Sequence, residues 1–344
     1  MTASDISPPP VRSAAAPTWR GLVASETQRL LARRATRALA VLALLGVVAA
    51  GLLALATTRQ PTAEDWARAQ AQAEEFRADA EQEWARCVAE APEGETAEYC
   101  GDLDDWAPDA EDLLDATPFN PADGLRVLVG AAGGLAAFAA FLIGATAGGA
   151  DWTARSMGML LVWEPRRTRV FMTRLAVLLT LSLVLAVTAI ALATALGSGV
   201  VSVRGTWDGF GSEGWTSLVG YQARLLPLVM LATAAGFGLA MIARSTGFAL
   251  GVAAGYLAVV ESAAQIWRWG SQWLVQTNVG IVLSGGPQEW PIGERVTEGL
   301  GPDEFGYEVV TVTITPIRAL LTLLVIILVI DLLALVLYRR RDLS

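Results

Sequence analysis

Residues 317–338 read IRALLTLLVIILVIDLLALVLY, and the length and composition of this segment decide the kind of fold. A helix needs about 20 mostly apolar residues to cross about 30 Å of hydrocarbon. Helices on the surface of soluble proteins show a polar face with a period of 3.6 residues, whereas this segment is apolar all round. We therefore predict that it crosses a membrane as a helix.

Five further segments share this character, which predicts an all-α polytopic membrane protein with six transmembrane helices. The first is preceded by 37 residues, and its apolar run is longer than the 7–15 residues of a signal peptide. We therefore expect an uncleaved anchor. Only Arg244 and Ser245 separate the fourth span from the fifth, which predicts a tight hairpin. The five segments are 38–57, 125–146, 175–196, 225–243 and 246–266.

The composition excludes several kinds of chemistry. Hydrophobic residues make up 53% and charged residues 17%, against about 25% charge in a typical soluble domain. There is no histidine and no lysine, so all 25 basic residues are arginine. A P-loop needs its lysine on the phosphates, and a Schiff-base enzyme needs one for the carbonyl. We expect no enzyme activity and no cofactor or metal in this chain; any ATP and Mg would be bound by another subunit.

The distribution of arginine predicts the orientation, because cytoplasmic loops collect basic residues. Arginines gather before the first span, between the second and third spans, at Arg244, and after the sixth span. Residues 58–124 instead hold 19 acidic residues and four arginines. Both termini are therefore expected in the cytoplasm, with the chain in the plasma membrane. The predicted cytoplasmic segments are 1–37, 147–174 and 339–344, and the extracellular loops are 58–124, 197–224 and 267–316.

The extracellular loops carry their own structural signals. In the acidic loop 58–124, Thr62 followed by Asp65 is typical of a helix N-cap and predicts a long polar helix from Thr62 to Val88. Cys87 and Cys100 are expected to form a disulfide on the oxidising side of the membrane, with two free thiols as the alternative. The acidic residues of 102–115 lack the spacing of a calcium loop and favour a solvated face. In loop 267–316, we expect an interfacial or re-entrant segment followed by a short extended segment over 306–315.

The cytoplasmic segments include two amphipathic elements. Residues 19–37 predict a basic amphipathic helix that lies in the headgroup plane before the first span. The second element begins at Asp151, where a carboxylate suits a helix N-terminus, continues with an apolar face and ends at Pro165. Such a helix between two spans can receive force from a cytoplasmic partner. An ordinary basic loop, the alternative, needs the arginines but not this order of acid, apolar face and proline.

This order of residues resembles the loop motif of ABC transporter permeases of the type-two class, in the form common in actinobacteria. The tail Arg340-Arg341-Asp342-Leu343 is similar to the family's ending, and the resemblance covers essentially the whole chain. Asp151 stands where the family usually has Glu, Met157 departs from its Gly-Thr pair, and the acidic first loop is longer than usual. The matching positions are Asp151, Trp152, Ser156, Met157, Leu160, Leu161, Pro165, Arg167 and Arg174.

The resemblance implies a division of labour. Two permease chains, alike or different, would form the pathway for export, and separate ATP-binding subunits would dock at the loop helix 151–165. No nucleic acid is expected as a partner. In the spans, small residues four apart allow close helix contact, and we expect Gly247, Gly251 and Gly255 to lie at or near a dimer interface.

Two acids, Glu261 and Asp331, lie inside predicted spans, where ionisable residues are costly and are candidates for function. The alternative is structural ion pairing, of Glu261 with Arg224 or Arg318 and of Asp331 with Arg174 or Arg244. Two other functions remain open. One is an ion-driven secondary transporter with either acid as proton carrier, and the other is a non-transporting scaffold or sensor with an acidic extracellular domain.

Overall fold

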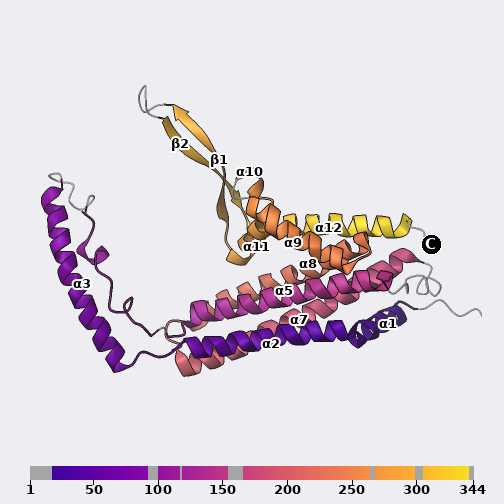
Figure 1. Cartoon of the computed structure of the whole chain (residues 1–344), viewed down its shortest axis with the longest axis horizontal. Coiled ribbons are helices and arrows are strands. Elements are labelled where there is room, and N and C mark those ends of the chain that lie inside the picture. The colour runs from indigo at the N-terminus through magenta and orange to yellow at the C-terminus, as the bar shows by residue number, and fades with distance from the viewer. Residues whose placement is uncertain are drawn as a thin grey trace, which may run out of the picture. The chain divides into compact units, whose positions relative to one another are not determined.

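The computed structural model describes residues 18–91, 100–116, 118–153, 166–263, 268–298 and 305–340. Within these ranges, five helices are long and apolar enough to cross a membrane (Figure 1). The chain is therefore a predominantly helical polytopic membrane protein, as the sequence predicts. The five helices are α2 (Arg34–Thr57), α5 (Pro121–Thr153), α7 (Arg167–Arg204), α8 (Gly211–Ala243) and α12 (Pro316–Arg340).

Three of these helices extend well beyond the apolar windows that predicted them. α5, α7 and α8 contain 33, 38 and 33 residues. At 1.5 Å per residue they are about 50, 57 and 50 Å long, compared with about 30 Å of hydrocarbon. The ends of these helices therefore project beyond the lipid core, where polar residues can continue a helix that apolar residues began.

The predicted fifth span, 246–266, begins as an α-helix but does not continue as one through its described residues. Arg244 takes a left-handed conformation in the hairpin, and Ser245 caps α9 (Thr246–Gly255) by accepting a hydrogen bond from Phe248 N. The chain then widens into the π-helix η2 (Tyr256–Glu261). The stretch from Thr246 to Glu261 is one of the shorter apolar helices rather than one of the five long ones.

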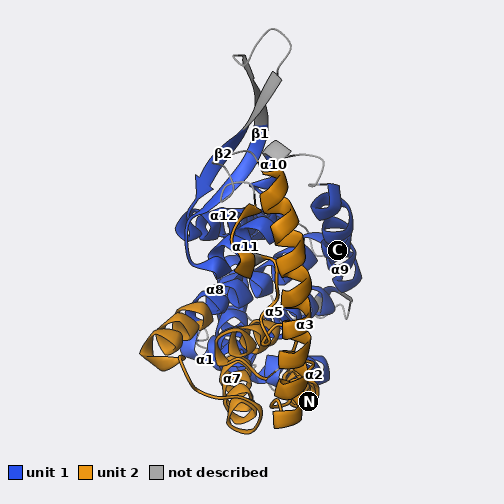
Figure 2. Cartoon of the chain, turned by 90° about the vertical axis from the view of Figure 1, so that its left-hand side faces the viewer, with its two compact units in different colours: residues 1–43, 134–187, 223–344 blue, residues 44–133, 188–222 orange. Residues whose placement is uncertain are grey.

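The chain divides into two compact units (Figure 2). Unit 1 comprises residues 1–43, 134–187 and 223–344, and unit 2 comprises 44–133 and 188–222. Unit 1 contains α1 (Trp19–Ala32), which ends at Arg33 before α2 begins, and everything from α9 onward. Unit 2 contains α3 (Ala63–Glu90) and the short 3-10 helix η1 (Leu103–Asp105). Helices α2, α5, α7 and α8 contribute residues to both.

Unit 1 also holds two paired β-strands, so the all-α prediction does not hold for 288–298 and 305–314. Strand β1 (Gln288–Glu298) pairs antiparallel with β2 (Phe305–Ile314), with an irregularity between Pro291 and Gly293. The extended segment predicted over 306–315 is thus confirmed as β2, but its partner strand was not predicted. The strand pair is preceded by α10 (Arg268–Ser271) and α11 (Val275–Ser284).

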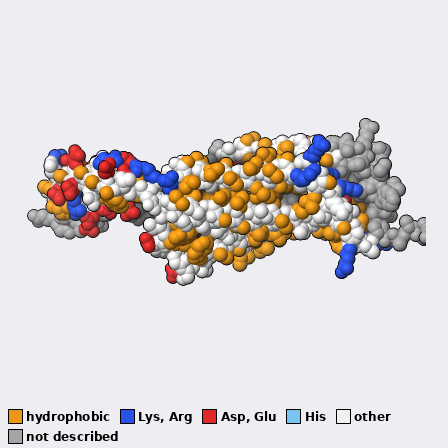
Figure 3. Space-filling model, turned by 90° about the horizontal axis from the view of Figure 1, so that it is seen from below, with side chains coloured by type: hydrophobic (Ala, Val, Ile, Leu, Met, Phe, Trp, Pro, Cys, Tyr) orange, Lys and Arg blue, Asp and Glu red, His pale blue; other side chains and the backbone are white. Residues whose placement is uncertain are grey.

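The base of the strand pair is packed against helices, which an isolated two-stranded sheet needs for stability. Ile281 and Val282 of α11, Ile314 of β2 and Ala319 of α12 form a buried cluster. Elsewhere, large hydrophobic side chains are exposed on the helices: Val127, Phe138 and Ile317 are 71%, 65% and 73% exposed. Figure 3 shows such side chains spread over the helices, whereas charged side chains cover α3.

Candidate functional site

An aromatic cluster joins several helices of unit 1 at the end of the bundle where α12 terminates. Phe171 of α7 lies 5.1 Å from Phe237 of α8 and 6.4 Å from Tyr338 of α12, measured between ring centroids. Trp152, near the end of α5, meets Tyr338 edge to face at 6.3 Å. Aromatic pairs at 4.5–7 Å contribute beyond the area they bury, so these contacts fix the four helix ends against one another.

Arginines tie the same helix ends together. The guanidinium of Arg244, in the turn after α8, lies 4.5 Å from the centroid of the Trp152 ring, which is cation–π geometry. Arg167 begins α7 and donates from Nη1 to the carbonyls of Tyr338 and Arg339 at 3.2 and 3.3 Å. The last carbonyls of a helix lack intrahelical partners and carry negative partial charge, so Arg167 caps α12.

A buried ion pair connects α1 to α7. Glu26 and Arg174 are 6% and 2% exposed, and Glu26 Oε2 lies 3.5 Å from Arg174 Nε. Arg174 also donates to the carbonyl of Ala147 on α5, and Arg33 donates to the carbonyl of Thr146. The helix that precedes the first span is therefore held against α7 by an ion pair, and Arg33, which follows it, is hydrogen-bonded to α5.

Two residues of the predicted coupling motif, Trp152 and Arg167, thus meet at Tyr338, while a third, Arg174, contacts α1 and α5. Asp151 belongs to α5, but its side chain is not among the described ones. Ser156, Met157, Leu160, Leu161 and Pro165 lie outside the described residues. Glu26 was not singled out from the sequence, although it lies between basic residues of a predicted basic helix, where a single acid is a usable signal.

Glu261 has a structural partner that the sequence did not suggest. Its Oε1 accepts a hydrogen bond from the backbone N–H of Gln276 at 3.0 Å, and Tyr256 Oη accepts one from Val275 N at 3.0 Å. Both donors lie in the first turn of α11, where backbone N–H groups lack helical partners and a negative charge is stabilised. Glu261 therefore caps α11.

The π-helix explains how both side chains reach α11. In an α-helix with 3.6 residues per turn, positions five apart lie about 140° apart around the axis. The i→i+5 pattern of a π-helix brings such positions toward one face, so Tyr256 and Glu261 both face α11. The expected ion pairs of Glu261 are not formed: Arg224 donates to the carbonyl of Leu283, and Arg318 donates to Gln272 Oε1.

Asp331 lies on the buried face of α12, 7% exposed. Its carboxylate occupies the space left by Gly238 of α8, because a Cβ on Gly238 would collide with Asp331 Oδ1. This oxygen has no hydrogen-bond partner among the described residues. The expected pairing with Arg174 or Arg244 is not formed, since Arg174 lies against Glu26 and Arg244 lies over Trp152.

The glycines fall into two groups. Gly144 of α5 and Gly236 of α8 pack against backbone, because an added Cβ would meet the carbonyl oxygens of Thr233 and Phe141 respectively. Among the described residues, nothing lies within 4 Å of a Cβ added at Gly251 or Gly255 of α9. Close packing by small residues thus operates between α5 and α8, while Gly251 and Gly255 contact no other described element.

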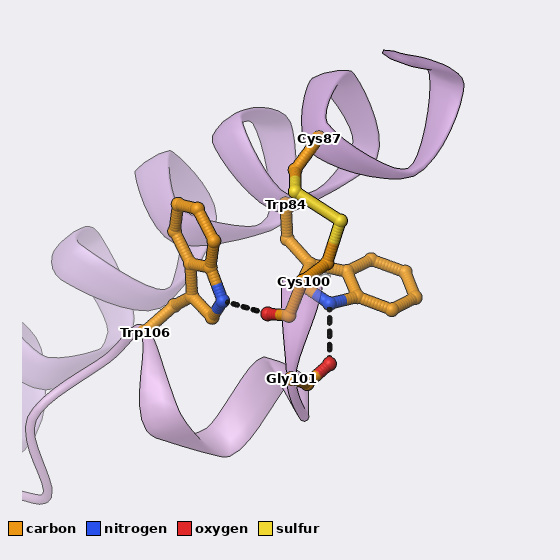
Figure 4. The surroundings of a disulfide bond; sticks show 5 residues. All are labelled: Trp84, Cys87, Cys100, Gly101 and Trp106. Carbon is orange, nitrogen blue, oxygen red and sulfur yellow. Dashed lines mark hydrogen bonds between the residues drawn. A yellow bond between two sulfur atoms is a disulfide. The ribbon is translucent and has the colours of Figure 1, made fainter. Parts of the chain in front are cut away.

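Unit 2 contains a lobe closed by the predicted disulfide. Cys87 of α3 is bonded to Cys100 with an S–S distance of 2.09 Å. Trp84 Nε1 donates to the carbonyl of Gly101 at 3.2 Å, and Trp106 Nε1 donates to the carbonyl of Cys100 at 2.7 Å (Figure 4). The Trp84 indole thus holds the segment after Cys100 against α3, and the Trp106 indole folds that segment back onto Cys100.

The start of α3 is fixed by a capping box, as its sequence predicts. Asp65 N donates to Thr62 Oγ1 and Thr62 N donates to Asp65 Oδ2, at 3.2 and 2.9 Å. Arg59 and Arg68 each lie 2.6 Å from the Asp65 carboxylate. The hydrogen bond from Arg59, followed by those from Thr62, holds the pKa of Asp65 far below its usual value.

The comparisons with known proteins give no further assignment. No protein-family model, no curated protein and no solved structure matches the chain. Among the described residues, no group of three or more acidic or cysteine side chains is arranged to hold a metal ion. The fold therefore defines a membrane protein, and the cluster at the helix ends of unit 1 is its best candidate for a functional site.

Proposed function

We propose that this chain is the transmembrane permease subunit of an ATP-binding cassette exporter, which forms the translocation pathway and couples to a separate ATPase subunit. The observation that carries the proposal is the cluster formed by residues before and after the segment 154–165. Trp152 before the segment, and Arg167 and Arg174 after it, each contact another helix of unit 1. Force applied to that segment would reach α1, α7 and α12 together.

The proposal includes a topology of six crossings in the plasma membrane with both termini inside. Five crossings correspond to the long apolar helices, and the sixth is the shorter stretch that begins with α9. The arginines of 1–37, of the segment between α5 and α7 and of the tail then share the cytoplasmic side, as the positive-inside rule requires. The disulfide-closed lobe lies outside, where thiols oxidise.

A second permease chain is part of the proposal. The open faces of Gly251 and Gly255 leave α9 available for close contact with another helix. We expect a cysteine placed at Gly251 to form an intermolecular crosslink, and a Gly251→Leu substitution to weaken the dimer crosslinked elsewhere. An undiminished dimer in the Gly251→Leu variant would remove α9 from the interface.

Partner capture tests the coupling site directly. The full chain is tagged and co-purified with the ABC ATPase of the nearest reading frame. We expect Arg167→Ala to reduce the ATPase retained by about tenfold, equivalent to about 1.4 kcal/mol, because it releases the end of α12 from α7. Arg34→Ala is the matched control, since Arg34 is an exposed arginine at the start of α2 and should leave retention unchanged.

Two results would overturn the proposal. One is transport by vesicles that contain this chain alone, without nucleotide or a second subunit. The other is labelling of a cysteine at Ser156 by an impermeant reagent added outside intact cells, because the loop would then face away from the ATPase.

One observation favours an alternative, the ion-driven secondary transporter. Asp331 is a buried carboxylate without a hydrogen bond to Oδ1 among the described residues, which is a usual property of proton carriers within membranes. Glu261 is less suited to this role, because its carboxylate caps α11. An Asp331→Asn variant distinguishes the functions: it abolishes transport driven by a proton gradient but leaves stimulation of a partner ATPase in place.

A further inference from the structure

A shallow, open groove in unit 2 lies where the polar part of α8 meets its more apolar part. The groove has a volume of about 400 Å³ and is lined by Ser212, Glu213, Thr216 and Ser217 of α8. These four positions share one face of the helix, because their spacing is one, three and one residues. Val219, two residues further along α8, is 58% exposed, which places the groove at the edge of the apolar region.

The start of α5 supplies a cation to the groove. Arg126 donates from Nη2 to Ser217 Oγ at 3.1 Å, and its guanidinium lies 5.5 Å from the centroid of the Tyr221 ring. The neighbouring Val127 is 71% exposed. A positive charge therefore lies at the groove beside a hydrophobic surface, the arrangement in which arginine contacts lipid headgroups.

Aromatic residues at and just before the start of α8 indicate the depth of the groove in the membrane. Trp207 and Trp215 stack with centroids 5.7 Å apart, and Phe210 meets Trp215 edge to face at 5.3 Å. The two tryptophans are 37% and 41% exposed. Tryptophan is enriched where a membrane meets water, so this aromatic group indicates that the groove lies at headgroup depth.

The hydrogen bonds of the groove define what it can bind. The Ser217 hydroxyl oxygen accepts the hydrogen bond from Arg126, so the hydroxyl hydrogen remains available to a phosphate oxygen. The Arg126 guanidinium can contact the same phosphate. Thr216 donates its hydrogen to the carbonyl of Ser212, which leaves its oxygen to accept. Glu213 supplies a carboxylate and has no ion pair among the described residues. One end of the groove is therefore donating and cationic, and the other is accepting and anionic.

We propose that this groove binds the headgroup of a phospholipid with a primary ammonium, of the phosphatidylethanolamine class. The phosphate lies on Arg126 and Ser217, and the ammonium donates to Glu213 and Thr216. Glu213 and Ser217 are one turn apart, with Cβ atoms about 5–6 Å from each other, a separation that two charged groups joined by a two-carbon linker can bridge. A trimethylammonium headgroup has no N–H to donate, and a glycerol headgroup carries no positive charge for Glu213.

Lipid retention tests the assignment and needs no nucleotide and no second subunit. The purified full chain is incubated with vesicles of equal parts phosphatidylethanolamine, phosphatidylcholine and phosphatidylglycerol, repurified, and its bound lipid is quantified by mass spectrometry. We expect several-fold enrichment of phosphatidylethanolamine. Arg126→Gln should reduce retention of all three lipids, and Glu213→Gln should remove the preference for phosphatidylethanolamine. Arg86→Gln and Glu64→Gln, exposed on α3, are the matched controls and should retain lipid as the unaltered chain does.

Three results would overturn the proposal. Equal retention of the three lipids by the unaltered chain would do so without any variant, and so would an unchanged preference in Glu213→Gln. Soluble phosphoethanolamine is added in a separate arm, because it offers the same charges without acyl chains. Displacement of the lipid by an equal concentration of this compound would show that the groove serves a soluble ligand rather than a lipid.

Discussion

The ion pair between Glu26 and Arg174 makes the sharpest prediction for the candidate site, because both side chains are buried. Taken alone, the side chains of Glu26 and Arg174 are 8% and 3% exposed. Removing one partner of a buried pair leaves the other charge uncompensated and costs 3–5 kcal/mol in proteins where this was measured. We expect the lower end, about 3 kcal/mol, because Arg174 keeps the Ala147 carbonyl and the pair is separated by 3.5 Å.

Three variants isolate this interaction. Glu26→Gln and Arg174→Gln each remove one charge, and the variant with Leu at both positions removes both charges. Replacing both members of a buried pair by apolar residues is often neutral or stabilising. The double replacement should therefore cost less than the two single changes together, with a coupling free energy of about 2 kcal/mol. Unfolding of the detergent-solubilised chain, followed by tryptophan fluorescence during SDS titration, measures all three.

Arg29→Gln is the matched control. Arg29 lies 3.3 Å from Glu26 Oε1 but is 45% exposed, and exposed ion pairs contribute about 0–1 kcal/mol. If Arg29→Gln destabilised the chain as much as Arg174→Gln, burial would not be what gives the pair its strength. Additive effects in the double Leu variant would likewise show that Glu26 and Arg174 do not interact.

Three further predictions concern other parts of the chain. Gly144→Ala should destabilise the fold by about 1–3 kcal/mol, because the new methyl group collides with the backbone of α8. Gly134→Ala is the control and should be neutral, because no described atom lies within 4 Å of a Cβ added there. The same SDS titration compares the two variants. The pKa of Asp65 is lower in the folded than in the unfolded chain. The Asp65 carboxylate therefore stabilises α3 fully above the unfolded pKa of about 3.9. This stabilisation is lost as the pH falls from there through the folded pKa. The protection factors of the amides at the start of α3 should therefore be constant from pH 7 to about 5 and fall in more acidic solution, with these amides unprotected throughout in Asp65→Asn. Cys87→Ser should destabilise unit 2 by about 3 kcal/mol. Cys100, which is buried in the unaltered chain, should then react with maleimide. An unreactive Cys100 would mean that the indole hydrogen bonds hold the lobe together without the disulfide.

The sequence predicted those elements whose signal is local. Apolar length identifies the five long helices, because lipid demands about 20 apolar residues whatever the fold. The capping box at Thr62 was predictable because its two partners are three residues apart. The disulfide was predictable because the sequence offers only Cys87 and Cys100, both in the acidic loop.

Features that depend on distant partners were not predictable in this way. Apolar periodicity does not reveal the π-helix from Tyr256 to Glu261, since the contact that accompanies it, from Glu261 to α11, joins residues 15 positions apart in the chain. β1 was missed because Gln288–Glu298 contains a proline and a glycine and shows no regular alternation. It is a strand because its neighbour β2 is one and because its base packs on α11 and α12.

Glu261 and Asp331 show why an acid in an apolar segment does not by itself define a function. From sequence they are equivalent, each a single carboxylate among aliphatic residues. The structure gives Glu261 two features of a structural residue, a backbone donor and the positive end of a helix. It gives Asp331 neither, and Gly238 leaves only the space that its carboxylate occupies. A residue that served only packing at this position would be apolar, since burying a carboxylate without partners costs stability. This cost makes Asp331, rather than Glu261, the candidate for a proton carrier in the proposed transport, and the Asp331→Asn variant tests it.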